Sequence, residues 1–206
     1  MLTLFEENKC PLCSQTNADV IEDHLVAFTG EHDYEGSSIV MPLCVNCHRV
    51  IHRCCWALIS EESEAILANY LALLKSSLPS SLAQALGDEL MAVKDSVIRE
   101  YQRVEGYNLS QRTRGDKQCA FCEHSNPDFM EEHIVVERGE YAHISSDIAV
   151  DVCANCHRVI IKFYEGKVLP TSKESKSLLD KYLVEFKHPL PAEAKKRLNQ
   201  FLQAID

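Results

Sequence analysis

The sequence lacks the features of membrane and secreted proteins. No apolar run among its 206 residues is long enough to cross a bilayer. The first seven residues carry neither the basic start nor the apolar core of a signal peptide. Glycine and proline are scarce, at seven residues each, and 46% of the residues are hydrophobic, as in globular proteins. We therefore expect a cytoplasmic globular protein with no membrane partner, built as one ordinary domain or two small ones.

Basic residues are also few, with 21 Lys and Arg against 31 Asp and Glu. The formal net charge is −10, which argues against a protein that holds nucleic acid by bulk attraction alone. A transcription-type zinc finger is disfavoured because the basic recognition surface is missing. Residues 1–109 carry 16 acidic and 7 basic side chains, whereas residues 110–206 carry 15 and 14. The second half therefore has either a simple solvated surface or the better surface for docking DNA or a partner.

Cysteine, by contrast, is abundant, and its spacing favours metal over disulfides. Eight of the ten cysteines fall into four Cys-x-x-Cys pairs, a spacing with which a tight turn grips one metal ion, as in zinc knuckles. The paired cysteines are Cys10, Cys13, Cys44, Cys47, Cys119, Cys122, Cys153 and Cys156. The other two, Cys54 and Cys55, have no such partner, and we expect them to pack within a helix.

The doubled cysteine pairs belong to an internal duplication. Sliding the sequence by 109 residues aligns it with itself without a gap, and 18 of the 43 positions between 10–52 and 119–161 are identical. Beyond the eight cysteines, the identical pairs include Glu22 with Glu131, His24 with His133, and His48 with His157. Each copy is too small for a large core, so we expect zinc to contribute much of its folding energy.

A short run at the second cysteine pair carries most of the chemistry. Cys44-x-x-Cys47 leads directly into His48-x-x-x-His52, whereas the second copy has Ile161 in place of the last histidine. Two histidines four residues apart share one face of a helix. Cys47 and His48 are neighbours and must point in different directions. The run can therefore serve a structural metal site and a second site that is open for chemistry.

Local patterns predict an α+β framework for these motifs. In the first copy, strands are expected at 20–28 and 38–43, followed by a helix from about 47 to 58. Apolar residues at helical spacing predict two more helices after each copy, at 61–74, 81–104, 172–186 and 192–205. Two domains follow, 1–109 and 110–206, each a zinc unit followed by a helix pair.

The order of these motifs is similar to that of a known protein family. The series Cys-x-x-Cys, Asp-His and Cys-x-x-Cys-His-x-x-x-His resembles that of the zinc-containing HNH endonucleases, which have a ββα-metal fold. The resemblance covers residues 10–58 and 119–165. It implies a tandem of two ββα-metal units, with two structural Zn²⁺ in closed sites of four thiolates each.

The resemblance also implies roles for the residues of the first copy. His24 is expected to activate water as the general base, since the ordinary pKa of histidine lies near working pH. Asp23, His48 and His52 are expected to hold one divalent ion, such as Mg²⁺ or Mn²⁺, on the scissile phosphate. The family usually has an asparagine ahead of the second strand, and Ser38 lies in that region here.

The second copy departs further from the family pattern. Glu132 replaces the aspartate, His133 and His157 remain, and Ile161 replaces one ligand. This loss predicts a degenerate second site on an intact zinc framework. Candidate phosphate contacts beside the two sites are Arg49, Arg158 and Lys162.

The function implied by the resemblance is a metal-dependent HNH endonuclease that hydrolyses DNA. Small HNH proteins of this kind stand beside ATPases in bacterial antiphage systems such as Septu. The resemblance therefore implies a protein partner, an ATPase for example, that delivers or activates the nuclease. The alternative is a non-enzymatic zinc-binding interaction module that binds protein through its helices. A pure scaffold needs the eight cysteines but has no reason to keep the Asp-His and His-x-x-x-His motifs together.

Overall fold

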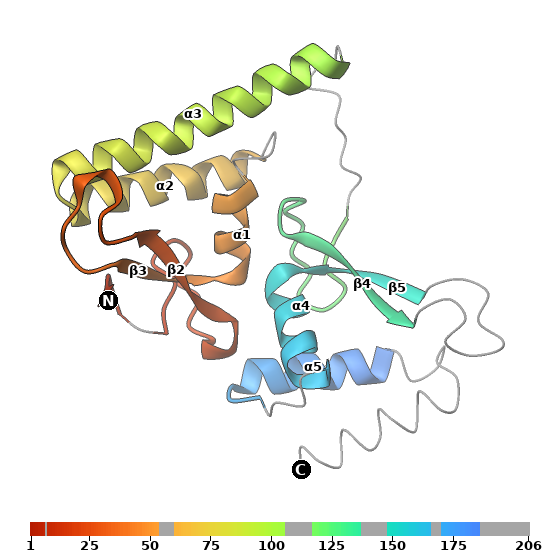
Figure 1. The fold of residues 1–206 in the computed structure, drawn as a ribbon. Coiled ribbons are helices and arrows are strands. Elements are labelled where there is room, and N and C mark those ends of the chain that lie inside the picture. The colour runs from red at the N-terminus through yellow and green to blue at the C-terminus, as the bar shows by residue number, and fades with distance from the viewer. Residues whose placement is uncertain (7, 54–59, 106–116, 137–147, 166–169, 186–206) are drawn as a thin grey trace. The chain divides into compact units, whose positions relative to one another are not determined.

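The computed structural model describes residues 1–6, 8–53, 60–105, 117–136, 148–165 and 170–185 of an α+β protein. The chain forms two compact units, which are drawn in Figure 1. Within the described residues, no helix is both long and apolar enough to cross a membrane. The expected domain boundary at 109/110, the expected helix at 192–205, and both Cys54 and Cys55 lie outside the described residues.

The first unit is built on a small sheet of three strands, in the order β1-β3-β2. The strands are β1 Leu2–Thr3, β2 Ile21–Ala27 and β3 Ile39–Cys44. β2 pairs antiparallel with β3, and β1 adds a parallel edge that the sequence pattern did not predict. β3 is buried at every position, which explains its continuous apolar run. β2 alternates instead, so one of its faces is available to the site.

Three helices follow the sheet of the first unit. They are α1 Val45–Arg53, α2 Glu61–Ser77 and α3 Ser80–Glu105. α1 packs on β2, β3 and α2, and α2 packs on α3 (Figure 1). The Ser60 side chain caps α2 by accepting a hydrogen bond from the backbone N–H of Ser63. The buried side of α2 then carries Ile66, Leu67 and Tyr70 at helical spacing.

The second unit repeats the antiparallel strand pair with strands of the same length and has shorter helices. Its elements are β4 Met130–Val136, β5 Ile148–Cys153, α4 Ala154–Ile160, the π-helical turn Ile161–Glu165 and α5 Lys173–Glu185. Glu131 of β4 pairs with Val152, as Glu22 of β2 pairs with Leu43. Both strand pairs also carry an irregularity at the equivalent position. The duplication therefore extends from the sequence to the hydrogen-bonding register.

Candidate metal centres and a histidine cluster

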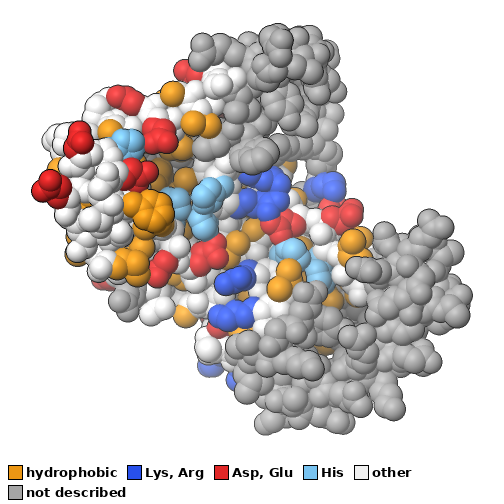
Figure 2. All heavy atoms as spheres, in the orientation of Figure 1, with side chains coloured by type: hydrophobic (Ala, Val, Ile, Leu, Met, Phe, Trp, Pro, Cys, Tyr) orange, Lys and Arg blue, Asp and Glu red, His pale blue; other side chains and the backbone are white. Residues whose placement is uncertain are grey.

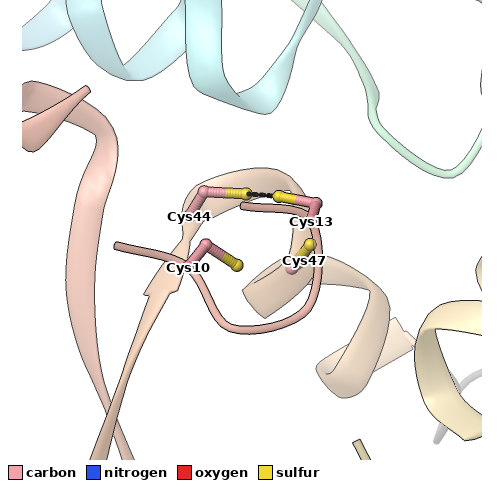
Figure 3. Close-up of side chains that lie close together, drawn as sticks. All are labelled: Cys10, Cys13, Cys44 and Cys47. Atoms are coloured by element: carbon pink, nitrogen blue, oxygen red, sulfur yellow. Dashed lines mark hydrogen bonds between the residues drawn. The ribbon is translucent and has the colours of Figure 1, made fainter. Parts of the chain in front are cut away.

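Four cysteine side chains converge in the first unit (Figure 3). The sulfur atoms of Cys10, Cys13, Cys44 and Cys47 all lie within 4.8 Å of one another. The Cys13 and Cys44 sulfurs are 3.5 Å apart, far beyond the ~2.05 Å of a disulfide. Four sulfurs about 2.3 Å from a tetrahedral zinc ion lie roughly 3.8 Å from one another. The cluster therefore has the spacing of a structural zinc site, with three cysteines buried and Cys13 exposed.

Three different elements bring these cysteines together. Cys10 and Cys13 lie in a turn closed by hydrogen bonds from Ser14 N to Cys10 O and from Cys10 N to Gln15 O, both 2.8 Å. Cys44 ends β3, and Cys47 lies in the first turn of α1. A bound ion would thus join the N-terminal turn to the strand–helix junction.

The second unit contains the same cluster. The sulfurs of Cys119, Cys122, Cys153 and Cys156 lie within 4.8 Å of one another, and those of Cys122 and Cys153 are 3.5 Å apart. The turn after Cys119 is closed by a 3.0 Å hydrogen bond from Glu123 N to Cys119 O. Glu123 has a φ of 60°, and Ser14 at the equivalent place has 61°. Both predicted sets of four cysteines are therefore assembled, as zinc binding requires.

Thiols packed this closely compete for protons. Hydrogen bonds from Cys13, Cys44 and Cys47 hold the pKa of Cys10 well below its usual value. The same contacts raise the pKa of Cys47, because Cys10 and the other thiols favour the protonated form and burial adds to the effect. The second cluster shows the same division, with the pKa of Cys119 lowered and that of Cys156 raised. A divalent cation satisfies all four sulfurs at once, which no sharing of protons does.

A separate cluster of three histidines lies in the first unit. His24 comes from β2, and His48 and His52 come from α1. Their ring nitrogens lie close enough for one metal ion. The Nε2 atoms of His48 and His52 are 2.8 Å apart, and the centroid of the His24 ring is 4.9 Å from that of His48 and 5.5 Å from that of His52. The spacing of four residues on α1 and the inward face of β2 together create this cluster.

The histidine cluster is open to solvent on one side. His24 is only 6% exposed, whereas His48 is half-buried and His52 is exposed. Figure 2 shows histidine side chains gathered at the surface on this face of the molecule. A ligand can therefore approach from the His52 side while His24 stays in the protein interior.

Two further side chains contact the cluster, and the sequence analysis did not assign a role to either. The Glu22 carboxylate bonds Nδ1 of His48, and the Tyr70 hydroxyl lies 3.1 Å from Nε2 of His24. The duplication gave a signal for Glu22 alone, which matches Glu131. The same shift of 109 residues places Tyr70 on Leu179, and only the contacts with His24 and His133 show that Tyr182 of α5 is the counterpart of Tyr70.

Asp23 does not join the cluster, in contrast to the role of metal ligand that the resemblance implies for it. Adjacent residues of a strand point to opposite faces of the sheet. Glu22 and His24 therefore share the face toward α1, and Asp23 is exposed on the other side. Glu132, the equivalent residue of the second unit, is exposed in the same way.

Burial and neighbouring rings favour the neutral form of two histidines of the cluster, His24 and His52. Burial, followed by the charges of His48 and His52, lowers the pKa of His24 to about 3. The pKa of His52 is also lowered, first by burial and then by His48. Neutral imidazoles are the form that binds metal or accepts a proton. His24 and His52 therefore have the form that either chemistry requires.

The second unit has an incomplete version of the same arrangement. The ring centroids of His133 and His157 lie 5.2 Å apart. Glu131 bonds Nδ1 of His157, and the Tyr182 hydroxyl is 3.2 Å from Nε2 of His133. Ile161, 37% exposed, replaces the third histidine. Burial, with a contribution from His157, lowers the pKa of His133 to about 4.

The remaining predicted residues lie on or next to the elements that carry these groups. Arg49 is half-buried, and Arg158 is exposed. Lys162 lies 5.5 Å from the centroid of the Phe163 ring, with its Nζ 4.0 Å from Asp19. The Ser38 hydroxyl accepts a 3.2 Å hydrogen bond from the backbone N–H of Thr29. This bond closes the loop between β2, the strand that carries His24, and β3.

No family model, curated protein or solved structure matches this chain.

Proposed function

We propose that this protein is a metal-dependent HNH-type endonuclease that hydrolyses DNA, and that its first unit is the catalytic one. The observation that carries the proposal is the convergence of His24, His48 and His52 beside a four-cysteine cluster. An antiparallel strand pair followed directly by a helix supplies all three histidines. From the HNH resemblance, we expect the general base and the metal ligands on this strand pair and helix.

The donor set indicates which ions the site would take. Without Asp23, the cluster offers only imidazole nitrogens. Imidazole suits zinc, nickel, cobalt and copper, whereas Mg²⁺ prefers oxygen. We therefore favour an ion such as Zn²⁺ or Ni²⁺ over the Mg²⁺ or Mn²⁺ that the resemblance alone implies. Such an ion would polarise the scissile phosphate as a Lewis acid.

Glu22 prepares His48 for this role. An imidazole that donates one N–H to a carboxylate keeps its other nitrogen free and fixes its ring orientation. With Glu22 on Nδ1, the free Nε2 of His48 faces Nε2 of His52, 2.8 Å away. These two nitrogens are the proposed core of the metal site.

His24 is the proposed general base. If its Nε2–H donates to the Tyr70 hydroxyl, then Nδ1 carries the free lone pair. The pKa of His24 is low without substrate. A phosphodiester anion raises the pKa of a nearby imidazole by favouring its charged form. Substrate binding thus makes His24 a better base where one is needed.

Charge sets the conditions for DNA binding. The first half carries a net of −9, from 16 acidic and 7 basic residues, so it repels phosphate at long range. We propose that the second half, or a protein partner such as an ATPase, brings DNA to the first unit. The degenerate second unit keeps its cysteine cluster without the third histidine, which fits an interaction module better than a second catalyst.

A plasmid-cleavage assay tests the proposal. Zinc-loaded protein is incubated with supercoiled DNA and Ni²⁺, Mn²⁺ or Mg²⁺, alone and with any partner that copurifies. Nicking is expected with Ni²⁺ rather than with Mn²⁺ or Mg²⁺, and His24→Ala should abolish it. His133→Ala is the matched control, because it alters the equivalent histidine of the second unit and should leave cleavage intact. Equal loss in both variants, or no cleavage under any condition, would favour the non-enzymatic interaction module.

A further inference from the structure

Each compact unit includes a four-residue segment from the other half of the sequence. The first unit contains Asn126–Phe129, and the second contains Asn17–Val20. The two segments are equivalent in the duplication, because each holds an Asn-x-Asp triplet at the same distance after its first cysteine pair. The helix that each segment contacts, and what that helix carries, give the exchange a functional meaning.

In the first unit, this segment caps α2. The Asp128 carboxylate accepts a 2.7 Å hydrogen bond from the backbone N–H of Ser60, the N-cap residue. The Asn126 side chain accepts from the Ser60 hydroxyl and donates to that of Ser63, both at 3.1 Å. Asp128 is 0% exposed and Asn126 3%. Buried polar groups at a helix start, where N–H groups lack helical partners, fix the position of that start.

In the second unit, the equivalent residues cap α5. Asp19 accepts hydrogen bonds of 3.1 Å from the backbone N–H groups of Thr171 and Ser172, and Asn17 donates one of 3.0 Å to the Ser175 hydroxyl. Burial opposes ionisation of Asp19, but the hydrogen bonds from Thr171, Ser175 and the backbone prevail and lower its pKa. Ser175 is 0% exposed, as Ser63 is in the first unit. The same contacts therefore occur twice, in reciprocal directions along the sequence.

Each capped helix holds a tyrosine against a histidine. Tyr70 of α2 lies seven residues after Ser63, and Tyr182 of α5 lies seven residues after Ser175. Seven residues are about two helical turns, so the serine and the tyrosine lie on the same face of each helix. The tyrosine hydroxyls contact His24 and His133 at 3.1 and 3.2 Å. A shift at the helix start is therefore transmitted to the histidine through a rigid element.

We propose that Asn126 and Asp128 are positioning residues for the histidine cluster of the first unit, and that Asn17 and Asp19 serve the histidines of the second. Each sequence repeat thereby completes the site of the other. Neither repeat contains all the residues that place its own tyrosine. The hydrogen bonds and burial above are the basis of this proposal. It rests on the proposed function in one respect, the expected change in metal affinity at the three-histidine cluster.

The test uses the full zinc-loaded chain and a matched pair of variants. Asp128→Ala and Asp19→Ala remove equivalent carboxylates, each from one helix start. ¹H–¹⁵N spectra of the imidazole rings report on His24 and His133 separately. Asp128→Ala should shift the His24 signals and leave those of His133 in place, and Asp19→Ala should do the reverse. A general loss of stability does not produce this crossed pattern.

Asp128→Asn supplies the rescue, because its amide oxygen still accepts the Ser60 N–H. It should restore the His24 signals toward those of the parent, and it carries the test if Asp128→Ala does not fold. Ni²⁺ affinity at the three-histidine cluster should weaken about tenfold in Asp128→Ala, the size of effect seen when the support of a metal ligand is removed. Shifts confined to a variant's own repeat, or equal at both rings, would overturn the proposal. If Ni²⁺ does not bind the parent, the proposed function fails, while the ring signals still decide the positioning role.

Discussion

At the scale of single residues, the neighbours Glu22 and Asp23 have opposite environments. Glu22 is half-buried against His48, and Asp23 is exposed on the far face of β2. Proximity in sequence made Asp23 look like a partner of His24. The strand's two-residue period instead brings Glu22, two positions away, to the face of His24. A motif matched letter by letter does not carry this information about faces.

This difference gives a paired prediction. Glu22→Ala should weaken Ni²⁺ binding about 10- to 100-fold, because the ring of His48 loses the carboxylate that orients it. Asp23→Ala should leave the affinity unchanged, since its side chain points into solvent. Calorimetric titration of zinc-loaded protein measures both. A larger loss in Asp23→Ala than in Glu22→Ala would restore the aspartate as the ligand.

His133 provides a pH prediction. Its pKa is lowered to about 4 in the folded protein, against about 6.5 in an unfolded chain. Between these values the unfolded state binds more protons, so the stability is present above pH 6.5 and declines as the pH falls toward 4. From pH 7 to pH 5, this one group should cost about 2 kcal/mol of unfolding free energy. Urea unfolding with excess zinc at both pH values gives the measurement.

His133→Gln is the control for that measurement, because glutamine does not titrate and can still reach the Tyr182 hydroxyl. The variant should lose less stability than the parent on acidification, by about 2 kcal/mol. Zinc release by the cysteine clusters affects parent and variant alike, so the difference isolates the histidine. An identical pH dependence in the two proteins would mean that the pKa of His133 is not lowered in the native state.

At the scale of elements, local sequence patterns predicted the helices better than the pairings between distant residues. Helices expected at 61–74 and 81–104 correspond to α2 Glu61–Ser77 and α3 Ser80–Glu105. Their apolar spacing and the serine ahead of α2 are local signals. β1 has only two residues and is defined by its pairing with β3. Such a pairing joins distant residues and leaves no period in the sequence.

The contacts of the two Asn-x-Asp triplets with the starts of α2 and α5 could not be predicted for the same reason. Their donors and acceptors are 63, 66 and 68 residues apart in the first unit, and 152, 153 and 158 in the second. The Asn-x-Asp triplets look like ordinary turn formers in the sequence. Only the fold shows that each triplet reaches the helix of the other repeat.

The helix after each second cysteine pair allows the missing ligand to be restored. Ile161 follows His157 by four residues, has helical backbone angles of −61° and −49°, and is 37% exposed. Ile161→His should therefore place a third imidazole beside His133 and His157 without disturbing the core. We expect the variant to bind one more Ni²⁺ per chain than the parent.

Ile161→Gln is the matched control, since it adds a polar side chain of similar length that is a poor ligand for Ni²⁺. Only the histidine variant should take up the additional ion. Ile161 is the first residue of a π-helical turn, which has a wider winding than an α-helix. If its wider winding turns position 161 away from His157, the two variants will bind equally.

At the scale of the whole molecule, the chain has two kinds of side-chain cluster that could hold a metal ion. Both repeats keep four cysteines with the spacing of a zinc site, but among the residues that the structure describes only the first keeps three converging histidines. The duplication thus preserves the cysteine framework in both halves and the three-histidine cluster in one. The division follows from a single position in the alignment, where His52 is matched by Ile161.

Metal stoichiometry of the intact chain tests this claim most directly. Native mass spectrometry of protein loaded with Zn²⁺ and then titrated with Ni²⁺ should reveal two tightly held Zn²⁺ and one additional Ni²⁺. His52→Ala should keep both zinc ions and lose the nickel, because the substitution removes a ligand of the open cluster and none of the cysteines. A parent chain that binds no third ion, or a His52→Ala chain that binds it equally well, would contradict the account.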